Sequence, residues 1–288
     1  MSLAIQRLQE GFLREQGEHA AVLVTSQENR FYLTGFPSSA GAVLVTEKKA
    51  YFLTDFRYAE AARRVISGCE VVCIKRMNDT LRELMEQNGV KRVFVEFERL
   101  SLRQAHDFET AFSKSGIEVE KGDKLDSALQ ALRTIKTPDE IQKLREAQKI
   151  TDDAFTHILD YIRPGRTERE VALELEFFMR RQGAEGVSFD FIVVSGTNGS
   201  LCHGVPSDKK IEDGDFVTMD TGALLHGYHA DMTRTVAVGH VSEEQRHAYD
   251  LVLQAQLAAI DAVRPGVPCE DIDKVARDIL EAEYKGAF

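Results

Sequence analysis

The fold of this chain is decided by the stretch Asp215-Phe-Val-Thr-Met-Asp-Thr-Gly-Ala-Leu-Leu-His-Gly-Tyr-His-Ala-Asp-Met-Thr-Arg-Thr-Val-Ala-Val238. Apolar and β-branched residues occupy both arms of the stretch, a composition typical of β-strands. Between the arms, His226-Gly227 is suited to a tight turn. The stretch therefore predicts an antiparallel hairpin with its bend near His226-Gly227.

Two aspartates, Asp220 and Asp231, stand on opposite arms of this hairpin. We expect Leu225 to pair with Tyr228. That register places Asp220 opposite Thr233, with Asp231 as its diagonal neighbour. Diagonal neighbours share one face and lie roughly 7–8 Å apart, so two carboxylates can reach one pair of divalent ions. The alternative is two solvated side chains on an ordinary hairpin, because aspartate is mostly exposed in proteins.

The residues around the aspartates resemble those of a known family. Met-Asp-Thr-Gly-Ala and Gly-Tyr-His-Ala-Asp-Met-Thr-Arg-Thr are similar to strands of the creatinase/aminopeptidase P metallopeptidases, whose fold is called pita-bread. Ser195-Gly-Thr-Asn-Gly-Ser-Leu-Cys-His-Gly204 resembles the active-site histidine loop of that family, although Cys202 stands where a proline is common. The similarity also covers Leu132–Ile141, Asn29–Phe36 and Thr54–Tyr58, and so extends over nearly the whole chain.

This resemblance implies roles for individual residues. Asp220 would bind one of two divalent metal ions, and Asp231 would bridge both. His203 would lie beside the substrate and the tetrahedral intermediate. Oxygen-rich ligation favours Mn²⁺ or Co²⁺ over metals that prefer thiolates. The resemblance also implies a homodimer.

Three functions are compatible with the resemblance. The first is hydrolysis of Xaa-Pro dipeptides, as in prolidase, and the second is removal of residues from longer Xaa-Pro peptides, as in aminopeptidase P. The third is a non-catalytic peptide-binding module on the same fold. The presence of both aspartates argues against creatinase, which keeps the fold without the metals. An Xaa-Pro dipeptidase is the function that we favour.

Two domains are expected. Residues 1–130 alternate strand-like and helix-like segments without any Gly-x-Gly-x-x-Gly or Walker-type loop, which predicts a creatinase-like α/β domain that carries no nucleotide signature. At Thr137-Pro-Asp-Glu140 a capping box predicts the start of a long helix and of a second domain, residues 137–288, with the α+β pita-bread fold. A second capping box, Thr167-Glu-Arg-Glu170, predicts a shorter helix.

The second domain contains an internal two-fold repeat. A long helix, an Arg-Pro-Gly stop and a short helix occur once around Arg163-Pro-Gly165 and again around Arg264-Pro-Gly266. In the repeated part, strands follow the first copy but not the second, so the second half is expected to be incomplete. The resemblance places one His and two Glu ligands after Phe288. The chain is therefore expected to be a truncated form that binds metal weakly and lacks peptidase activity.

Composition excludes several classes of protein. The chain has 288 residues, of which 43% are hydrophobic and 29% charged, as is ordinary for a globular protein. A net charge of −11 with dispersed Lys and Arg argues against nucleic-acid partners. No apolar run approaches the roughly 20 residues of a membrane span, and no signal-peptide core is present, so a cytoplasmic protein is expected. The four cysteines are expected to be free thiols.

Overall fold

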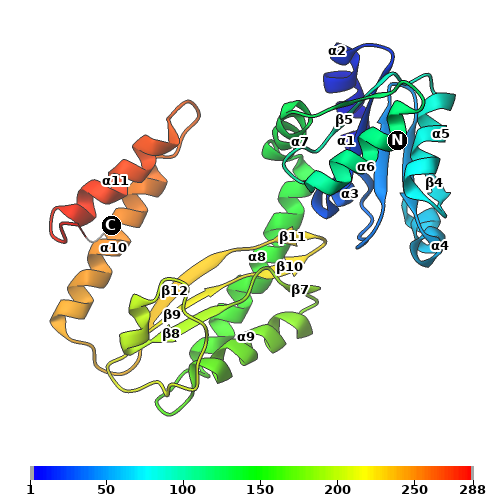
Figure 1. Ribbon diagram of the computed structural model, residues 1–288. Helices are drawn as coiled ribbons and strands as arrows, with labels where there is room; N and C mark the ends of the chain where they lie inside the picture. The colour runs from blue at the N-terminus through cyan, green and yellow to red at the C-terminus, as the bar shows by residue number, and fades with distance from the viewer. Residues whose placement is uncertain (1–2, 287–288) are drawn as a thin grey trace. The chain divides into compact units, whose positions relative to one another are not determined.

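The computed structural model describes residues 3–286 (Figure 1). The chain divides into two compact units, residues 1–141 and 142–288. The first contains a single six-stranded sheet, and the second contains two three-stranded sheets.

The sheet of the first unit has the strand order β4-β3-β2-β1-β5-β6. The pairs β1–β2 and β2–β3 are antiparallel, whereas β1–β5, β3–β4 and β5–β6 are parallel. The strands are β1 Ala20–Val24, β2 Ala42–Thr46, β3 Ala50–Thr54, β4 Glu70–Cys73, β5 Arg92–Val95 and β6 Glu118–Glu120.

Helices cover both faces of this sheet. The helices are α1 Leu3–Leu8, η1 Gln9–Leu13, α2 Arg14–Gln16, α3 Gln27–Thr34, α4 Phe56–Val65, α5 Met77–Gln87, α6 Leu102–Ser113 and α7 Lys124–Thr134. Val22 and Val24 of β1 join one core with α1, α3 and α7, while Ala21 and Leu23 join another with α5 and α6. Successive strand residues point to opposite faces, which explains why the five residues of β1 are all buried.

These observations confirm the α/β architecture predicted for the N-terminal region. Ser101 and Gln104 form a capping box at the start of α6. The strand that carries Cys73 is less buried than the strands in the middle of the sheet. Strand β4 lies at the edge of the sheet, so its residues are only partly covered.

The second unit begins with two helices that share a core with the strands after them. Ile150, Ala154 and Ile158 of α8 pack with Val171 and Leu175 of α9 and with strand residues. The elements are α8 Pro138–Leu159, α9 Glu168–Arg181, β7 Gly186–Val187, β8 Ile192–Ser195, η2 Gly196–Ser200, β9 Phe216–Thr221, β10 Ala223–Leu225, β11 Tyr228–His229, β12 Met232–Ala237, α10 Glu243–Ala262 and α11 Cys269–Glu281.

Helix starts and the helical repeat agree with the sequence prediction. Thr137 and Thr167 form the predicted capping boxes, and Ser242 forms another at the start of α10. The long helix α8 and shorter α9 are followed later by the long α10 and shorter α11, which pack side by side (Figure 1). In residues 3–286, no helix combines the length and apolar composition that a membrane crossing requires.

Two apolar residues on the helical stripes remain largely exposed. Ile141 is 41% exposed, because it lies in the first turn of α8, before the helix reaches its core. Val252 of α10 is 54% exposed, since α10 meets α11 through Leu251 and Ala255. Helical periodicity identifies an apolar stripe but not the neighbour that covers it.

Candidate metal centre

The aspartate hairpin has the predicted register. Leu225 pairs with Tyr228, and Asp220 pairs with Thr233. The turn between the arms has positive φ at both central positions, 53° at His226 and 72° at Gly227. Positive φ at both positions is characteristic of a type I′ turn, whose twist matches that of the strands it joins. The turn chemistry therefore sets the register of the two aspartates.

The sequence predicted a single antiparallel hairpin, but the ladder of the hairpin is interrupted. It divides at Gly222 into two sheets, with the strand orders β12-β9-β8 and β11-β10-β7. A Cβ at Gly222 would lie 2.6 Å from the carbonyl carbon of Ala230 and closer still to its oxygen. The Ala230 N–H donates to the Ala223 carbonyl at 2.9 Å, which holds the arms together at this point. Only glycine permits so close an approach of the two backbones.

Asp220 and Asp231 line one hollow of about 530 Å³. Asp220 Oδ1 accepts a hydrogen bond from Thr233 Oγ1 at 2.8 Å. Among residues 3–286, no group donates a hydrogen bond to the carboxylate of Asp231. The hollow thus receives two carboxylates, most of whose oxygens have no protein donor.

His203 lines the same hollow. It follows the short helix η2 and lies in an exposed turn. No hydrogen bond joins its imidazole to another described residue. The structure therefore brings the three predicted site residues, from two separate segments, to one concave surface, with the imidazole free to meet a ligand.

Sequence reasoning missed the apolar wall of the hollow. Phe189 and Phe191 approach edge to face, with ring centroids 6.5 Å apart. The wall consists of Phe189, Phe191, Ile192, Val205 and Pro206. A small apolar group, such as a proline ring, could pack against these side chains while the polar groups face the carboxylates.

The carboxylate pair fits a hard divalent cation in the type of donor it offers. It does not supply a complete ligand set. In the part of the chain that the structure describes, no group of three or more His, Cys, Asp and Glu side chains is arranged to hold a metal ion. Two carboxylates balance only half of the charge on two divalent ions, so a site for two ions here would need further ligands.

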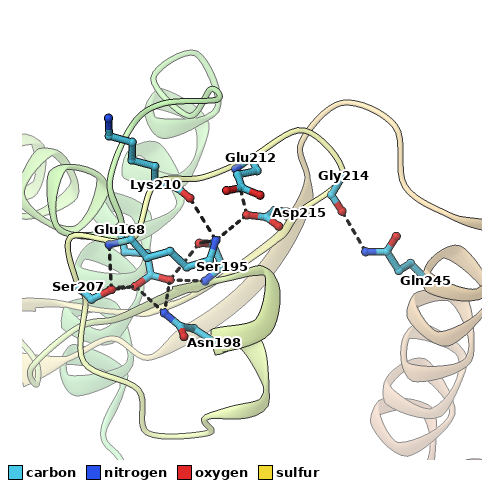
Figure 2. A network of polar contacts seen from close by, with 10 residues as sticks. Glu168, Ser195, Asn198, Ser207, Lys210, Glu212, Gly214, Asp215 and Gln245 are labelled. Carbon is cyan, nitrogen blue, oxygen red and sulfur yellow. Dashed lines mark hydrogen bonds and ion pairs between the residues drawn. The ribbon is translucent and has the colours of Figure 1, made fainter.

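A buried carboxylate, that of Glu168, lies next to the histidine loop, and sequence reasoning missed it. Glu168, the first residue of α9, is completely buried. Figure 2 shows its carboxylate surrounded by Ser195, Asn198 and Ser207. The only sequence signal was a glutamate inside a capping box, which ordinarily places that side chain in solvent. Its partners lie 27 to 39 residues away and could not be deduced locally.

Comparison with known proteins assigns the chain to a family. Residues 142–288 match metallopeptidase family M24, and residues 5–147 match the creatinase/prolidase N-terminal domain. The chain belongs to metallopeptidase family M24. The M24 assignment confirms the resemblance seen in the sequence, together with the pita-bread catalytic domain and its creatinase-like N-terminal domain.

Relatives of this M24 chain include proteins of known structure. It is 40% identical to the uncharacterized peptidase YqhT of Bacillus subtilis over 268 residues, which are 93% of this chain and 74% of the relative. An Xaa-Pro dipeptidase from Bacillus anthracis superposes with a TM-score of 0.89 at 39% identity, covering 97% of this chain and 77% of that one. An X-Pro aminopeptidase from Thermotoga maritima superposes with a TM-score of 0.87 at 33% identity, covering 96% and 78%.

Proposed function

We propose that this M24 protein, in a form whose metal site has a complete ligand set, hydrolyses the peptide bond that precedes proline and that its preferred substrates are Xaa-Pro dipeptides. The observation that carries the proposal is the meeting of Asp220, Asp231 and His203 on one hollow with an apolar wall. The name of the Bacillus anthracis relative, an Xaa-Pro dipeptidase, supports the choice of substrate.

Asp220 and Asp231 would contribute two ligands to a pair of divalent ions, with Mn²⁺ or Co²⁺ favoured by oxygen donors. Such ions supply Lewis acidity, which polarises a carbonyl group and lowers the pKa of water. Thr233 holds Asp220 through the 2.8 Å hydrogen bond, and this contact orients one carboxylate before any ion arrives. The tight crossing at Gly222 limits how far Asp231 can move relative to Asp220.

His203 would donate a hydrogen bond to the substrate carbonyl oxygen or to the oxyanion that develops on it. A donor at this position stabilises negative charge as the carbonyl is attacked. The imidazole makes no hydrogen bond to another described residue, so substrate binding does not have to break one. Its neighbours Val205 and Pro206 belong to the apolar wall, which places donor and wall on one segment.

A peptide bond before proline suits this arrangement. The prolyl nitrogen carries no N–H, so the bond can be recognised only through its carbonyl oxygen and its ring. His203 and the carboxylate pair would act on the carbonyl side, while the ring would pack against Phe189 and Phe191. Apolar walls with a few convergent polar groups are typical of small-molecule sites.

Cleavage of longer Xaa-Pro peptides is the second candidate. The similarity to an X-Pro aminopeptidase of Thermotoga maritima supports it. The two functions differ in whether the site accepts residues after the proline.

A homodimer, which the family resemblance implies, also remains a prediction that light scattering can test.

The proposal is tested with protein that carries a complete ligand set, loaded with Mn²⁺ or Co²⁺, and the peptides Ala-Pro, Ala-Pro-Ala and Ala-Ala. We expect Ala-Pro to be cleaved fastest and Ala-Ala to resist cleavage. Faster cleavage of Ala-Pro-Ala would favour the aminopeptidase. Binding of both proline peptides without cleavage, in a preparation that calorimetry shows to be loaded with metal, would favour a peptide-binding module.

The metal-ligand assignment is tested with Asp231→Asn and a matched control, Asp190→Asn. Asp190 lines the same hollow but is not assigned to the metal. We expect Asp231→Asn to weaken Mn²⁺ binding at least about tenfold, because a charged ligand is lost, and Asp190→Asn to change it less than about threefold. Equal effects of the two variants would show that general negative charge, and not ligation by Asp231, attracts the ion.

A further inference from the structure

A buried carboxylate stands behind the histidine loop. Glu168 has 0% exposure, and its Oε1 accepts from the Ser195 N–H at 2.7 Å and the Ser195 hydroxyl at 3.0 Å. Its Oε2 accepts from the Ser207 hydroxyl at 2.6 Å and the Ser207 N–H at 3.2 Å. The Asn198 amide donates to both oxygens, at 3.1 and 3.3 Å. One carboxylate is thus saturated with donors.

These donors come from the two ends and the middle of one segment, residues 195–207. Ser195 ends strand β8, Asn198 lies in η2, and Ser207 follows the apolar residues Val205 and Pro206. The segment would otherwise be a long irregular connection with exposed residues. Because the carboxylate holds all three points, it closes the segment into a loop of defined shape (Figure 2).

A short chain of backbone contacts joins Asn198 to His203. The Leu201 N–H donates to the Asn198 carbonyl at 2.9 Å, and the Gly204 N–H donates to the Leu201 carbonyl at 3.0 Å. Gly204 also lies against Val194, since a Cβ there would be 2.5 Å from Val194 Cγ1. His203 is therefore held between two fixed points, Leu201 and Gly204.

A lysine supports the same cluster. Lys209 Nζ donates to the Ser195 hydroxyl at 3.0 Å and forms an ion pair with Asp215 at 2.9 Å. Gly196 follows Ser195 with φ +54°, and a Cβ there would lie 2.9 Å from Asp215 Cγ. The start of the loop is therefore restrained from two sides, by Glu168 and by the Lys209–Asp215 pair.

We propose that Glu168 is a positioning residue, which orients His203 over the hollow by fixing the loop of residues 195–207 from behind. Glu168 does not line the hollow and is not a catalytic residue. The inference rests on the proposed function for the role of His203, whereas the orientation of the loop can be measured independently of activity.

The position requires a carboxylate and not an amide. The N–H groups of Ser195 and Ser207 approach different oxygens and can only donate. A glutamine would turn its own NH₂ group toward one of them, leaving two donors facing each other in a buried site. An unpaired buried donor destabilises the conformation that contains it.

The test compares Glu168→Gln with Glu170→Gln. Glu170 lies in the same helical turn, but it bonds to Thr167 and Arg166 and not to the loop. We expect amide exchange in residues 196–204 to accelerate roughly 10–10²-fold in Glu168→Gln only, as expected for loss of a charged hydrogen bond. We also expect the imidazole NMR signals of His203 to shift, while those of His226 and His229 remain unchanged.

Three outcomes would overturn the proposal: equal loop exchange in the two variants, faster exchange spread over the whole unit of residues 142–288, or an unshifted His203. If Glu168→Gln does not fold, Asn198→Ala supplies the same test, because it removes only the link from the carboxylate to the middle of the loop. The same increase in exchange and the same His203 shift are then expected.

A kinetic cycle separates this inference from the proposed function. In protein that cleaves Ala-Pro, Glu168→Gln should lower kcat about 10–10²-fold with KM changed less than about threefold. Added to His203→Ala, it should lower kcat less than about threefold further. If the two substitutions instead lowered kcat by the product of their separate effects, Glu168 would act independently of His203. Absence of all turnover in protein with a complete ligand set would count against the proposed function, and loop exchange and the His203 signals would then decide the inference.

Discussion

Replacing Gly222 with alanine tests the close backbone approach of Gly222 and Ala230, which lies between the two aspartates on the hairpin. The new Cβ would lie 2.6 Å from the Ala230 carbonyl carbon, whereas non-bonded carbon atoms ordinarily stay about 3.5–4.0 Å apart. Both obstructing atoms of Ala230 belong to the backbone, so no side chain can rotate away. The two arms must therefore separate by about 1 Å.

The energetic cost follows from this separation. It would stretch the 2.9 Å hydrogen bond from the Ala230 N–H to the Ala223 carbonyl beyond bonding distance, a loss of about 1 kcal/mol. Overpacking against the backbone adds about 1–3 kcal/mol. We expect Gly222→Ala to lower the free energy of unfolding by about 2–4 kcal/mol, which moves the urea midpoint by about 1–2 M if m is about 2 kcal/mol/M.

Circular dichroism is the suitable assay, because the chain contains no tryptophan. Gly199→Ala is the matched control, since no atom lies within 4 Å of a Cβ there, and its stability should remain within about 1 kcal/mol of the original. A Gly222→Ala midpoint that shifts no more than that of Gly199→Ala would refute the close-approach argument.

Further predictions concern pH, thiol reactivity and metal affinity. Burial acts to raise the pKa of Glu168, but hydrogen bonds from Ser207, Asn198 and Ser195 outweigh it and leave this pKa below its ordinary value. The contribution of Glu168 to the free energy of unfolding should therefore be complete above about pH 4.3 and decline as pH falls through the lowered pKa. Urea midpoints measured at pH 3–6 report this decline. In Glu168→Gln the part of the pH dependence that comes from Glu168 should be absent. Burial raises the pKa of Cys69 to about 12, so iodoacetamide at pH 8 should spare it in mass spectra while modifying the exposed thiols, which are Cys73, Cys202 and Cys269. Calorimetry of the 288-residue chain should show weak Mn²⁺ binding, with Kd about 0.1–1 mM, because the described residues supply two carboxylate ligands; micromolar binding of two ions would contradict this.

Local chemistry made much of the second unit predictable. Each capping box, such as that of Thr167, is complete within four residues, so the start of its helix needs no distant partner. The turn at His226-Gly227 likewise sets the pairing of Asp220 with Thr233, because register follows from the turn by counting. The metal-ligand roles of Asp220 and Asp231 came from family resemblance and remain predictions until metal binding is measured.

Distant contacts determined the rest. The hairpin ladder is interrupted at Gly222 because the backbone carbonyl of Ala230 packs directly against it. The alternation of residues along a strand gives no sign of this close approach. Glu168 is buried because Ser195 and Ser207, far along the chain, fold over it. From the sequence alone, the periodicity of strands and helices, their caps and their turns were determined, since these depend on neighbours within a few residues. Which side chains are covered, and which polar groups meet, was decided only by the tertiary structure, because burial and hydrogen bonding depend on segments that the chain brings together after those elements form.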